Sequence, residues 1–234
     1  MSSIILIDDN NRHEHGDELD KMHALRHEVF VEQLKWPALK SVNGREYDQY
    51  DVPGAVYIVV KEGEDIAASV RLNWADKPTL LADVFPHLLQ FETAPTGADT
   101  VDLSRFMVSP KYGSRDRMNR YGSDLICGIL EYGASEGIAN YTAVISTHFL
   151  STILQWGVEA HAMGLPAGEG REEHVAVRVP ATETSISHLY HFTRNYTPRL
   201  RTPRFTRWFN ETAEMLRTAE MARQGSSRRR AAAE

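Results

Sequence analysis

Two hydrophobic patterns alternate along the chain, and each predicts one type of element. Short apolar runs bounded by polar or turn-forming residues are typical of buried strands, whereas apolar residues three or four positions apart are typical of amphipathic helices. Strands are expected at residues 4–7, 56–60, 66–72, 101–108, 141–146 and 174–179, and helices at residues 17–34, 117–136, 148–156, 183–194 and 204–223.

Two turn signals refine this reading. The polar run 62–65 between two expected strands indicates a hairpin, and Gly137 is suited to the C-terminal cap of the helix before it. Strands and helices that alternate in this order predict a mixed α/β fold, a twisted sheet with helices on both faces in three layers.

Size and composition limit the possible classes of protein. A chain of 234 residues with 42% hydrophobic content can bury one full core. We expect a single domain over residues 1–224 and a disordered tail over residues 225–234. A net charge of −6 argues against a general nucleic-acid binder.

Location follows from what the sequence lacks. No apolar run approaches the roughly 18 residues of a membrane span, and the first residues include no basic region of a secretory signal. The single cysteine, Cys127, is compatible with a reducing compartment. We therefore expect a cytoplasmic protein that binds neither membranes nor nucleic acids.

Candidate chemistry concentrates in one acidic segment, Glu-Tyr-Asp-Gln-Tyr-Asp at residues 46–51, and in arginines of other segments. The planar fork of arginine suits a carboxylate, and carboxylates suit an ammonium group or act as bases. Together they could hold a zwitterionic amino acid and deprotonate its amine. Three simpler alternatives stay open: a solvated acidic turn, an Arg26 whose stem packs on the core, and a structural ion pair for Arg71.

Six sequence blocks occur in a fixed order around these residues. They are Met22–Trp36, Gly44–Asp51, Val56–Val60, Val70–Leu72, Leu81–Leu88 and Asp102–Phe106. The ordered set resembles the acyl-homoserine-lactone synthases, the autoinducer synthases of bacterial quorum sensing. The resemblance runs from about Leu19 to Pro166.

The resemblance implies a fold, a reaction and its substrates. The fold would be similar to that of the N-acetyltransferases. The enzyme would acylate the amine of S-adenosyl-L-methionine from an acyl thioester, close the lactone and release 5′-methylthioadenosine. S-adenosyl-L-methionine would be a substrate, and neither a metal nor a separate cofactor is expected. Two alternatives are a small-amine N-acyltransferase that uses acyl-CoA and a non-catalytic acyl-binding relative.

The resemblance also assigns roles to residues. The expected catalytic residues are Asp48, Arg71, Asp102 and Arg105. The expected substrate-binding residues are Arg26, Phe30, Trp36, Asp51 and Phe85, with Phe85 packing under the site. The family usually has Glu where this chain has Asp102, and the shorter side chain could pass its role to Asp48 or to a bridging water.

Two details of the site are expected from strand geometry and from the resemblance. Asp102 and Arg105 are three residues apart and would lie on opposite faces of a regular strand, so a bulge near 103–104 is needed to bring them together. The position that faces the acyl chain falls on Thr142 or Ala143, and an unsubstituted acyl chain is favoured.

The acyl donor would arrive at a basic segment between a strand and a helix. Its expected contacts are Lys111, Arg115, Arg117 and Arg120. Basic side chains beside a helix N-terminus suit either the phosphates of CoA or an acidic acyl-carrier protein. We favour acyl-CoA over acyl-carrier protein as the donor.

Overall fold

A seven-stranded sheet runs through the protein, in the order β1-β4-β5-β6-β7-β9-β8. The computed structural model describes residues 2–113, 120–170, 173–200 and 204–211. Within these ranges the strands of this sheet are β1 (Ser2–Ile7), β4 (Val56–Glu62), β5 (Asp65–Trp74), β6 (Thr100–Val108), β7 (Asn140–Ser146), β8 (His161–Ala162) and β9 (His174–Pro180).

All six predicted strands are present, and the expected hairpin joins β4 to β5. β6 and β7 run parallel, while the other neighbouring strands of the sheet are antiparallel. The β6–β7 pairing ends at Leu103 and Ala143, although both strands continue for several residues. The sheet is therefore splayed between these two strands.

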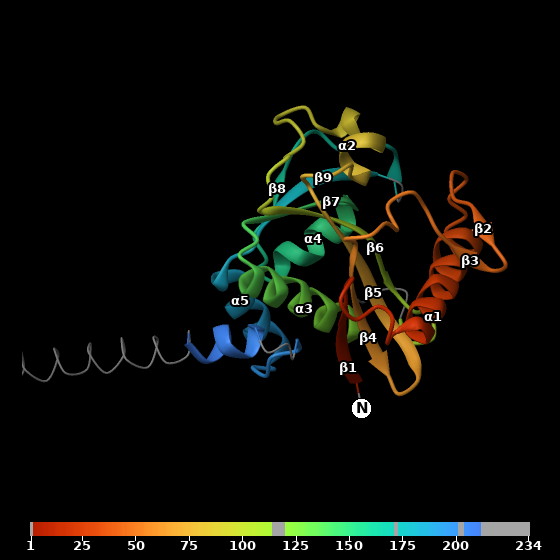
Figure 1. The fold of residues 1–234 in the computed structure, drawn as a ribbon. Coiled ribbons are helices and arrows are strands. Elements are labelled where there is room, and N and C mark those ends of the chain that lie inside the picture. Colours follow the sequence, from red (N-terminus) through yellow and green to blue (C-terminus); the bar gives the residue numbers. More distant parts are fainter. Residues whose placement is uncertain (1, 114–119, 171–172, 201–203, 212–234) are drawn as a thin grey trace, which may run out of the picture.

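Helices cover both faces of the sheet (Figure 1). One face carries α1 (Gly16–Arg26) and the π-helix η1 (His27–Gln33). The other face carries α3 (Arg120–Glu136), α4 (Thr147–Gln155) and α5 (Glu183–Thr193). Gly137, with φ of 72°, follows α3 in the left-handed conformation expected of a C-terminal cap.

The prediction of one α-helix over 17–34 was wrong, because the backbone changes to π-helical geometry after Arg26. Residues 204–211 are helical, whereas the rest of the helix predicted to 223 and the expected tail 225–234 lie outside the described residues. Sequence periodicity also missed five short elements, β2 (Ser41–Val42), β3 (Arg45–Glu46), α2 (Leu80–Val84), the 3-10 helix η2 (Pro86–Leu88) and β8 (His161–Ala162).

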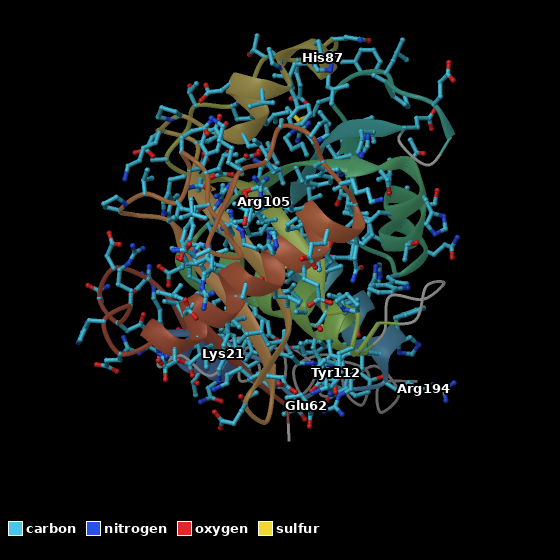
Figure 2. The ribbon with its side chains drawn as sticks, turned by 90° about the vertical axis from the view of Figure 1, so that its right-hand side faces the viewer. Lys21, Glu62, His87, Arg105, Tyr112 and Arg194 are labelled. Atoms are coloured by element: carbon cyan, nitrogen blue, oxygen red, sulfur yellow. The ribbon has the colours of Figure 1, made fainter. Side chains whose placement is uncertain are left out.

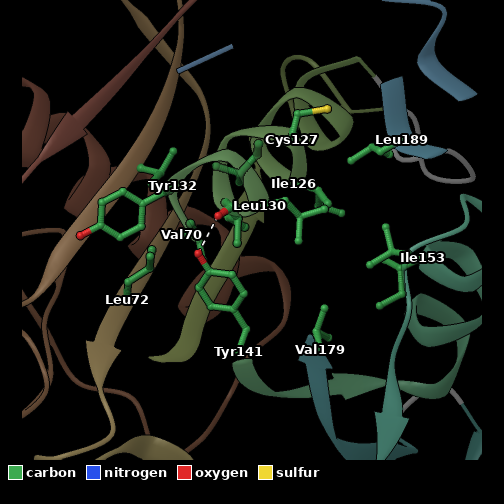
Figure 3. Close-up of a cluster of buried hydrophobic side chains, with 14 of the residues drawn as sticks. Val70, Leu72, Ile126, Cys127, Leu130, Tyr132, Tyr141, Ile153, Val179 and Leu189 are labelled. Atoms are coloured by element: carbon green, nitrogen blue, oxygen red, sulfur yellow. Dashed lines mark hydrogen bonds between the residues drawn. The ribbon is translucent and has the colours of Figure 1, made fainter. Parts of the chain in front are cut away.

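Alternating residues of β4 divide the interior into two cores. Ile58 packs in the core beneath α3, α4 and α5, whereas Tyr57 and Val59 pack beneath α1. Figure 3 shows part of the first core, where the hydroxyl of Tyr141 donates a hydrogen bond to the carbonyl of Ile129 at 2.6 Å. The two faces differ in chemistry, because buried charged residues of β5 and β6 point toward α1. None of the described helices is long and apolar enough to span a membrane.

Candidate active site

Cross-strand register places a row of polar side chains on the α1 face of the sheet. Asn73 of β5 pairs with Asp102 of β6, and Asp102 pairs with Thr142 of β7. In the next row Tyr57 pairs with Arg71, and Arg71 pairs with Ser104. The Nε of Arg71 donates to the hydroxyl of Ser104 at 3.1 Å, so both side chains point to the same face.

Glu46 joins two arginines from distant segments. The short hairpin of β2 and β3 packs on α1 and directs Glu46 into the interior, where its side chain is fully buried. Its carboxylate accepts from the Nε of Arg26 at 2.6 Å and from the Nη2 of Arg105 at 2.8 Å. Figure 2 labels Arg105 near the centre of the molecule. Glu46 thereby connects the helix α1 to the strand β6.

Asp48 and Asp51 complete the charged group from the turn after β3. Asp51 binds both terminal nitrogens of Arg26, at 2.7 and 3.0 Å, and lies 2.9 Å from the Nη1 of Arg71. Asp48 binds both terminal nitrogens of Arg71, at 2.5 and 3.0 Å, and lies 2.7 Å from Arg105. We call Arg26, Arg71, Arg105, Glu46, Asp48 and Asp51 the six-charge cluster.

The six-charge cluster balances three guanidiniums with three carboxylates in the interior of the protein. Arg26 and Arg71 are each 1% exposed. Burial alone would raise the pKa of Asp51, but the hydrogen bonds and charges of Arg26 and Arg71 hold that pKa well below its usual value. Removing one member of a buried ion pair typically costs ~3–5 kcal/mol, because the partner charge stays unpaired. The cluster therefore works as one unit.

The cluster also settles where three of the predicted residues lie. Asp48 and Asp51 are not on a solvated turn, since both carboxylates are buried against arginines. The guanidinium of Arg26 donates its hydrogen bonds to Glu46 and Asp51. Arg26 would therefore influence a bound ligand by holding these two carboxylates in place.

Asp102 lies beside the cluster but forms no ion pair with any described residue. It accepts the hydroxyl of Thr142 at 2.8 Å and the backbone N–H of Leu81 at 3.4 Å. Burial is the main influence on its carboxyl and raises the pKa of Asp102 to about 7. A carboxyl with this pKa can exchange a proton near neutral pH, which is what general base catalysis requires.

A β-bulge brings Arg105 to the same face as Asp102, as expected. Arg71 pairs with Ser104, while Ser69 pairs with Met107, so two residues of β6 face Val70 alone. Arg105 adopts a left-handed φ of 55° at this point. The bulge was predicted near 103–104, but the two residues that form it are 105 and 106, slightly further along β6.

Two aromatic pairs cover the cluster on the α1 side. Phe30 is buried and stacks on Trp36, which is 40% exposed, with ring centroids 4.9 Å apart. The guanidinium of Arg105 lies 5.6 Å from the Phe30 ring centroid. His23 stacks on Tyr47 at 3.9 Å, and its Nδ1 lies 2.9 Å from the backbone carbonyl of Glu46. The aromatic residues thus fix the cluster and leave Trp36 accessible.

Strand alternation separates the two candidates for the acyl-facing position. Thr142 points to the cluster face and binds Asp102, whereas Ala143 belongs to the core beneath α3, α4 and α5. Phe85 packs against a small apolar cluster that includes Leu88, as does Val144 of β7. The role of Phe85 as a support under the site stays a prediction.

Two of the four predicted donor residues, Lys111 and Arg120, lie in the described part of the chain. Lys111 is exposed and binds Asp65, the first residue of β5, and Arg120 is the first residue of α3. Arg115 and Arg117 lie outside the described residues.

Sequence reasoning left Glu46, Tyr57, Ser104 and His23 out of the site. Glu46 looked like one more acidic residue of a turn, because the two-residue strand β3 has no periodicity to reveal its burial. Tyr57 donates its hydroxyl to Asp51 at 2.8 Å, which no strand pattern predicts. The spacing of Ser104 two residues after Asp102 was the one available signal, since such residues share a strand face. Within the described residues, no group of three His, Cys, Asp or Glu side chains is placed to hold a metal ion.

Comparison with known proteins identifies the family. A family model described as "Autoinducer synthase" matches residues 9–189. An isovaleryl-homoserine lactone synthase of Bradyrhizobium diazoefficiens is 33% identical over 158 residues, which cover 67% of this chain and 70% of that protein. An acyl-homoserine-lactone synthase of Pseudomonas aeruginosa is 32% identical, over 67% of this chain and 76% of that protein.

Solved structures agree with this match. A CoA-dependent acyl-homoserine lactone synthase, BjaI, with SAM and isopentyl-CoA, superposes with a TM-score of 0.78 and 27% identity, over 89% of this chain and 99% of that chain. A putative N-acetyltransferase from Lactobacillus plantarum, at 16% identity and a TM-score of 0.51 over 77% of this chain and 99% of that chain, shares the fold alone. The chain belongs to the autoinducer synthase family and is an acyltransferase of the acyl-homoserine-lactone synthase type.

Proposed function

We propose that the protein makes an N-acyl-L-homoserine lactone from S-adenosyl-L-methionine and an acyl-CoA, and releases 5′-methylthioadenosine. S-adenosyl-L-methionine is then a substrate, and the chemistry uses no separate cofactor. The observation that carries the proposal is the six-charge cluster beside the unpaired carboxyl of Asp102, at the point where β6 and β7 splay. The match to the autoinducer synthase family supports it.

In the first step the amine of S-adenosyl-L-methionine attacks the thioester carbonyl. A C–N bond forms, the C–S bond breaks, and the thiol leaves with a proton. Asp102 takes the amine proton, directly or through water, because it is the site carboxyl that no arginine pairs with in the described residues. Asp48 is less suited to this role, since its two oxygens are held by Arg71 and Arg105.

The second step closes the lactone within the acylated substrate. A carboxylate oxygen attacks the γ-carbon, an O–C bond forms, and the bond from that carbon to the sulfonium sulfur breaks. The sulfur leaves as the neutral thioether of 5′-methylthioadenosine. Trp36 offers an accessible aromatic face near the cluster, where a sulfonium cation gains ~0.5–2 kcal/mol of cation–π attraction.

An apolar region that could take the acyl chain lies on this face of the sheet, away from the six-charge cluster. An acyl chain that extended toward β4 and β5 would lie against the charged side chains of the six-charge cluster. Toward β9 lies the small apolar cluster of Leu81, Leu88, Met163 and Ala176, each at most 1% exposed. These side chains are already closely packed, so a short or branched acyl chain displaces less of the protein than a long chain does.

Thr142 contributes to the preference for an unsubstituted acyl chain. Its hydroxyl hydrogen is donated to Asp102, so it is not available to a 3-oxo group of the chain. A 3-oxo substrate would have to compete with a buried hydrogen bond to a carboxylate. This geometry favours an acyl chain without an oxygen at the third carbon.

Turnover by the purified protein tests the proposal. The protein is incubated with S-adenosyl-L-methionine and matched acyl-CoA and acyl-carrier-protein donors, and products are identified by mass spectrometry. The proposal expects a lactone, 5′-methylthioadenosine in equal amount, and a higher kcat/KM with acyl-CoA. Equal or better use of the carrier protein contradicts the donor assignment. An acylated amine without lactone contradicts the reaction.

A further inference from the structure

A cavity lies at the end of the sheet where β4 begins and β5 ends. It has a volume of about 350 Å³, near the lower end of the ~300–1,000 Å³ that is usual for small-molecule sites. Its lining comes from the segment that precedes β4, from the end of β5 and the segment after it, and from Asp83 of α2. None of the six charged residues of the cluster lines it.

Two tight turns shape the cavity. Before β4, the N–H of Ala55 donates to the carbonyl of Val52 at 3.0 Å. The central residues of this turn are proline and glycine, and Gly54 has the φ of 90° that a type II turn requires. After β5, the N–H of Lys77 donates to the carbonyl of Trp74 at 3.1 Å. The walls are therefore set by backbone turns at the ends of two paired strands, so a ligand would find them already ordered.

An ammonium group without a carboxylate partner lies at the cavity. The Nζ of Lys77 is 2.7 Å from the point where a Cβ on Gly54 would stand, so this side chain is folded against the turn before β4. Lys61 pairs with Glu18 at 2.7 Å, whereas Lys77 forms no ion pair with any described residue. The N–H donors of Lys77 are thus available to an anion.

Asp83 also lines the cavity, but it has a different partner. Its carboxylate accepts the hydroxyl of Tyr50 at 3.1 Å and makes no ion pair with Lys77. An anionic group is therefore attracted to the Lys77 side of the cavity and repelled from the Asp83 side. This charge distribution gives an anionic ligand one preferred orientation.

The rest of the lining suits an apolar group of about the size of one ring. Trp74 contributes an aromatic side chain, and Pro53 and Pro78 contribute aliphatic rings. An aromatic ring buries a large apolar area and prefers another flat group as its neighbour. One apolar ring with one carboxylate would therefore match both the walls and Lys77.

Tyr50 separates the cavity from the six-charge cluster. Its N–H donates to Asp48 at 2.8 Å, and the guanidinium of Arg71 lies 5.6 Å from its ring centroid. Its carbonyl accepts from the side-chain amide of Asn73 at 3.0 Å. A ligand in the cavity would contact a residue that touches the cluster, without occupying the cluster itself.

We infer that this cavity is a second ligand site, which binds a small carboxylate with a ring-sized apolar body. The carboxylate binds the ammonium of Lys77, and the body packs against Trp74. The inference goes beyond the proposed function and does not depend on it, because it rests on residues outside the six-charge cluster.

Calorimetry with phenylacetate, which carries one ring and one carboxylate, tests the inference. We expect phenylacetate to bind wild type, and to bind Lys77→Gln about tenfold more weakly because a charge-assisted hydrogen bond is lost. 2-Phenylethylamine, with the same ring and the opposite charge, should bind wild type about tenfold more weakly than phenylacetate. The inference is wrong if wild type does not bind phenylacetate, if Lys77→Gln binds it equally well, or if the amine binds as tightly.

Two further variants locate the binding. Val52→Trp keeps Lys77 but fills the cavity, so it should also weaken phenylacetate binding about tenfold; Val52 is 38% exposed and can take a larger side chain. Lys40→Gln removes the charge of an exposed lysine that does not line the cavity, and its affinity should equal that of wild type. Wild-type affinity in Val52→Trp, or an equal loss in Lys40→Gln, would place phenylacetate elsewhere and overturn the inference.

Binding of phenylacetate needs no turnover, so this experiment is independent of the proposed function. Lactone formation by a wild-type protein that does not bind phenylacetate would reject the cavity and leave the proposed function intact. Phenylacetate binding that depends on Lys77, in a protein that forms no lactone, would do the reverse.

Discussion

At Asp48 two guanidiniums share one carboxylate, and this arrangement explains why the carboxylates of the acidic segment are turned away from solvent. Arg71 contributes two hydrogen bonds and Arg105 lies 2.7 Å away. The pairing with Asp48 and Asp51 outweighs burial and holds the pKa of Arg71 above its usual value. Each carboxylate of the cluster pairs with arginines of two segments, and each arginine pairs with two of the three carboxylates, so a change at one residue affects the geometry of the others.

Removing the charge of Asp48 tests the cluster as part of the active site. Asp48→Asn keeps the side chain's shape but leaves two buried guanidiniums with too little negative charge. We expect kcat/KM to fall at least ~10²-fold while the protein stays folded, as checked by circular dichroism. Asp20→Asn is the matched control, because Asp20 pairs with Arg45 on the surface. Near wild-type turnover of Asp48→Asn would contradict a catalytic or positioning role.

Asp102 predicts a pH dependence with a definite sign. Its pKa of about 7 means that the carboxylate form, the base, is populated above that pH. We expect kcat/KM to rise through pH 7 in wild type and to lose this step in Asp102→Asn. Asp102→Glu restores the residue usual in the family and should keep or raise activity. Inactive Asp102→Glu would contradict the assignment of Asp102 to the site.

The same raised pKa affects stability in the opposite direction. Unfolded Asp102 ionises near pH 4, whereas the folded protein holds the proton until about pH 7. Wild type should therefore lose up to ~4 kcal/mol of unfolding free energy, relative to Asp102→Asn, as the pH rises across this window. Urea unfolding at several pH values measures the difference, and a difference independent of pH would contradict the buried, protonated state.

Among the elements, those that bury a continuous apolar run were predictable from sequence. Val56–Val60 is such a run, and it became β4 because both of its faces pack against helices. The π-helix after Arg26 was not predictable, since its apolar residues also fit an α-helix. Its backbone depends on tertiary contacts, including the packing of Phe30 on Trp36.

The site was predictable in its residue types but not in its pairing. The order of motifs placed Arg26, Asp48, Asp51 and Arg71 near one another, and the structure brings them together. Glu46 was missed because its burial depends on the two-residue strand β3 docking on α1. Pairings between segments more than twenty residues apart are decided by the fold, and local periodicity carries no information about them.

The short helix α2 links element stability to the site. Thr79 caps α2 by accepting from the N–H of Ala82 at 3.2 Å, and the preceding N–H group, that of Leu81, donates to Asp102 at 3.4 Å. We expect Thr79→Ala to lower the unfolding free energy by ~1 kcal/mol and also to lower kcat/KM, because Asp102 loses a fixed donor. Thr182→Ala removes the equivalent cap of α5, away from the site, and should cost similar stability with unchanged kcat/KM. Equal effects of both variants on activity would contradict the link.

At the scale of the whole molecule, the separation of β6 from β7 beyond Leu103 and Ala143 divides the sheet into two parts. Helices that pack across this opening hold the two parts together. Direct β6–β7 pairing covers only the residues from Thr100 to Leu103. Across the opening, α3 packs against β4, β5 and β6 and also contacts α5, which follows β9. A cavity lined by residues of α3 and by Phe192 and Thr193 of α5 borders this α3–α5 contact.

Glu131 is the buried group that fastens this contact. Its carboxylate accepts the hydroxyl of Tyr190 at 2.5 Å and the backbone N–H groups of Arg199 and Leu200, at 2.9 and 2.6 Å from one of its oxygens. All three partners of the Glu131 carboxylate are hydrogen-bond donors. In Glu131→Gln the side-chain N–H groups are donors as well, so they would face one of these partners and that hydrogen bond would be lost. An unsatisfied buried group of this kind costs ~1–3 kcal/mol.

We therefore expect Glu131→Gln to lower Tm by several degrees and to raise the KM for acyl-CoA more than the KM for S-adenosyl-L-methionine, since it loosens α3, whose first residue Arg120 is an expected donor contact. Calorimetry and initial rates measure the two effects. Glu136 lies on the same helix but pairs with the exposed Arg204, so Glu136→Gln should change Tm by at most a degree or two. Equal Tm values for the two variants would show that the α3–α5 contact does not depend on Glu131. A larger KM change for S-adenosyl-L-methionine would instead place the effect of Glu131 at the six-charge cluster, on the other face of the sheet.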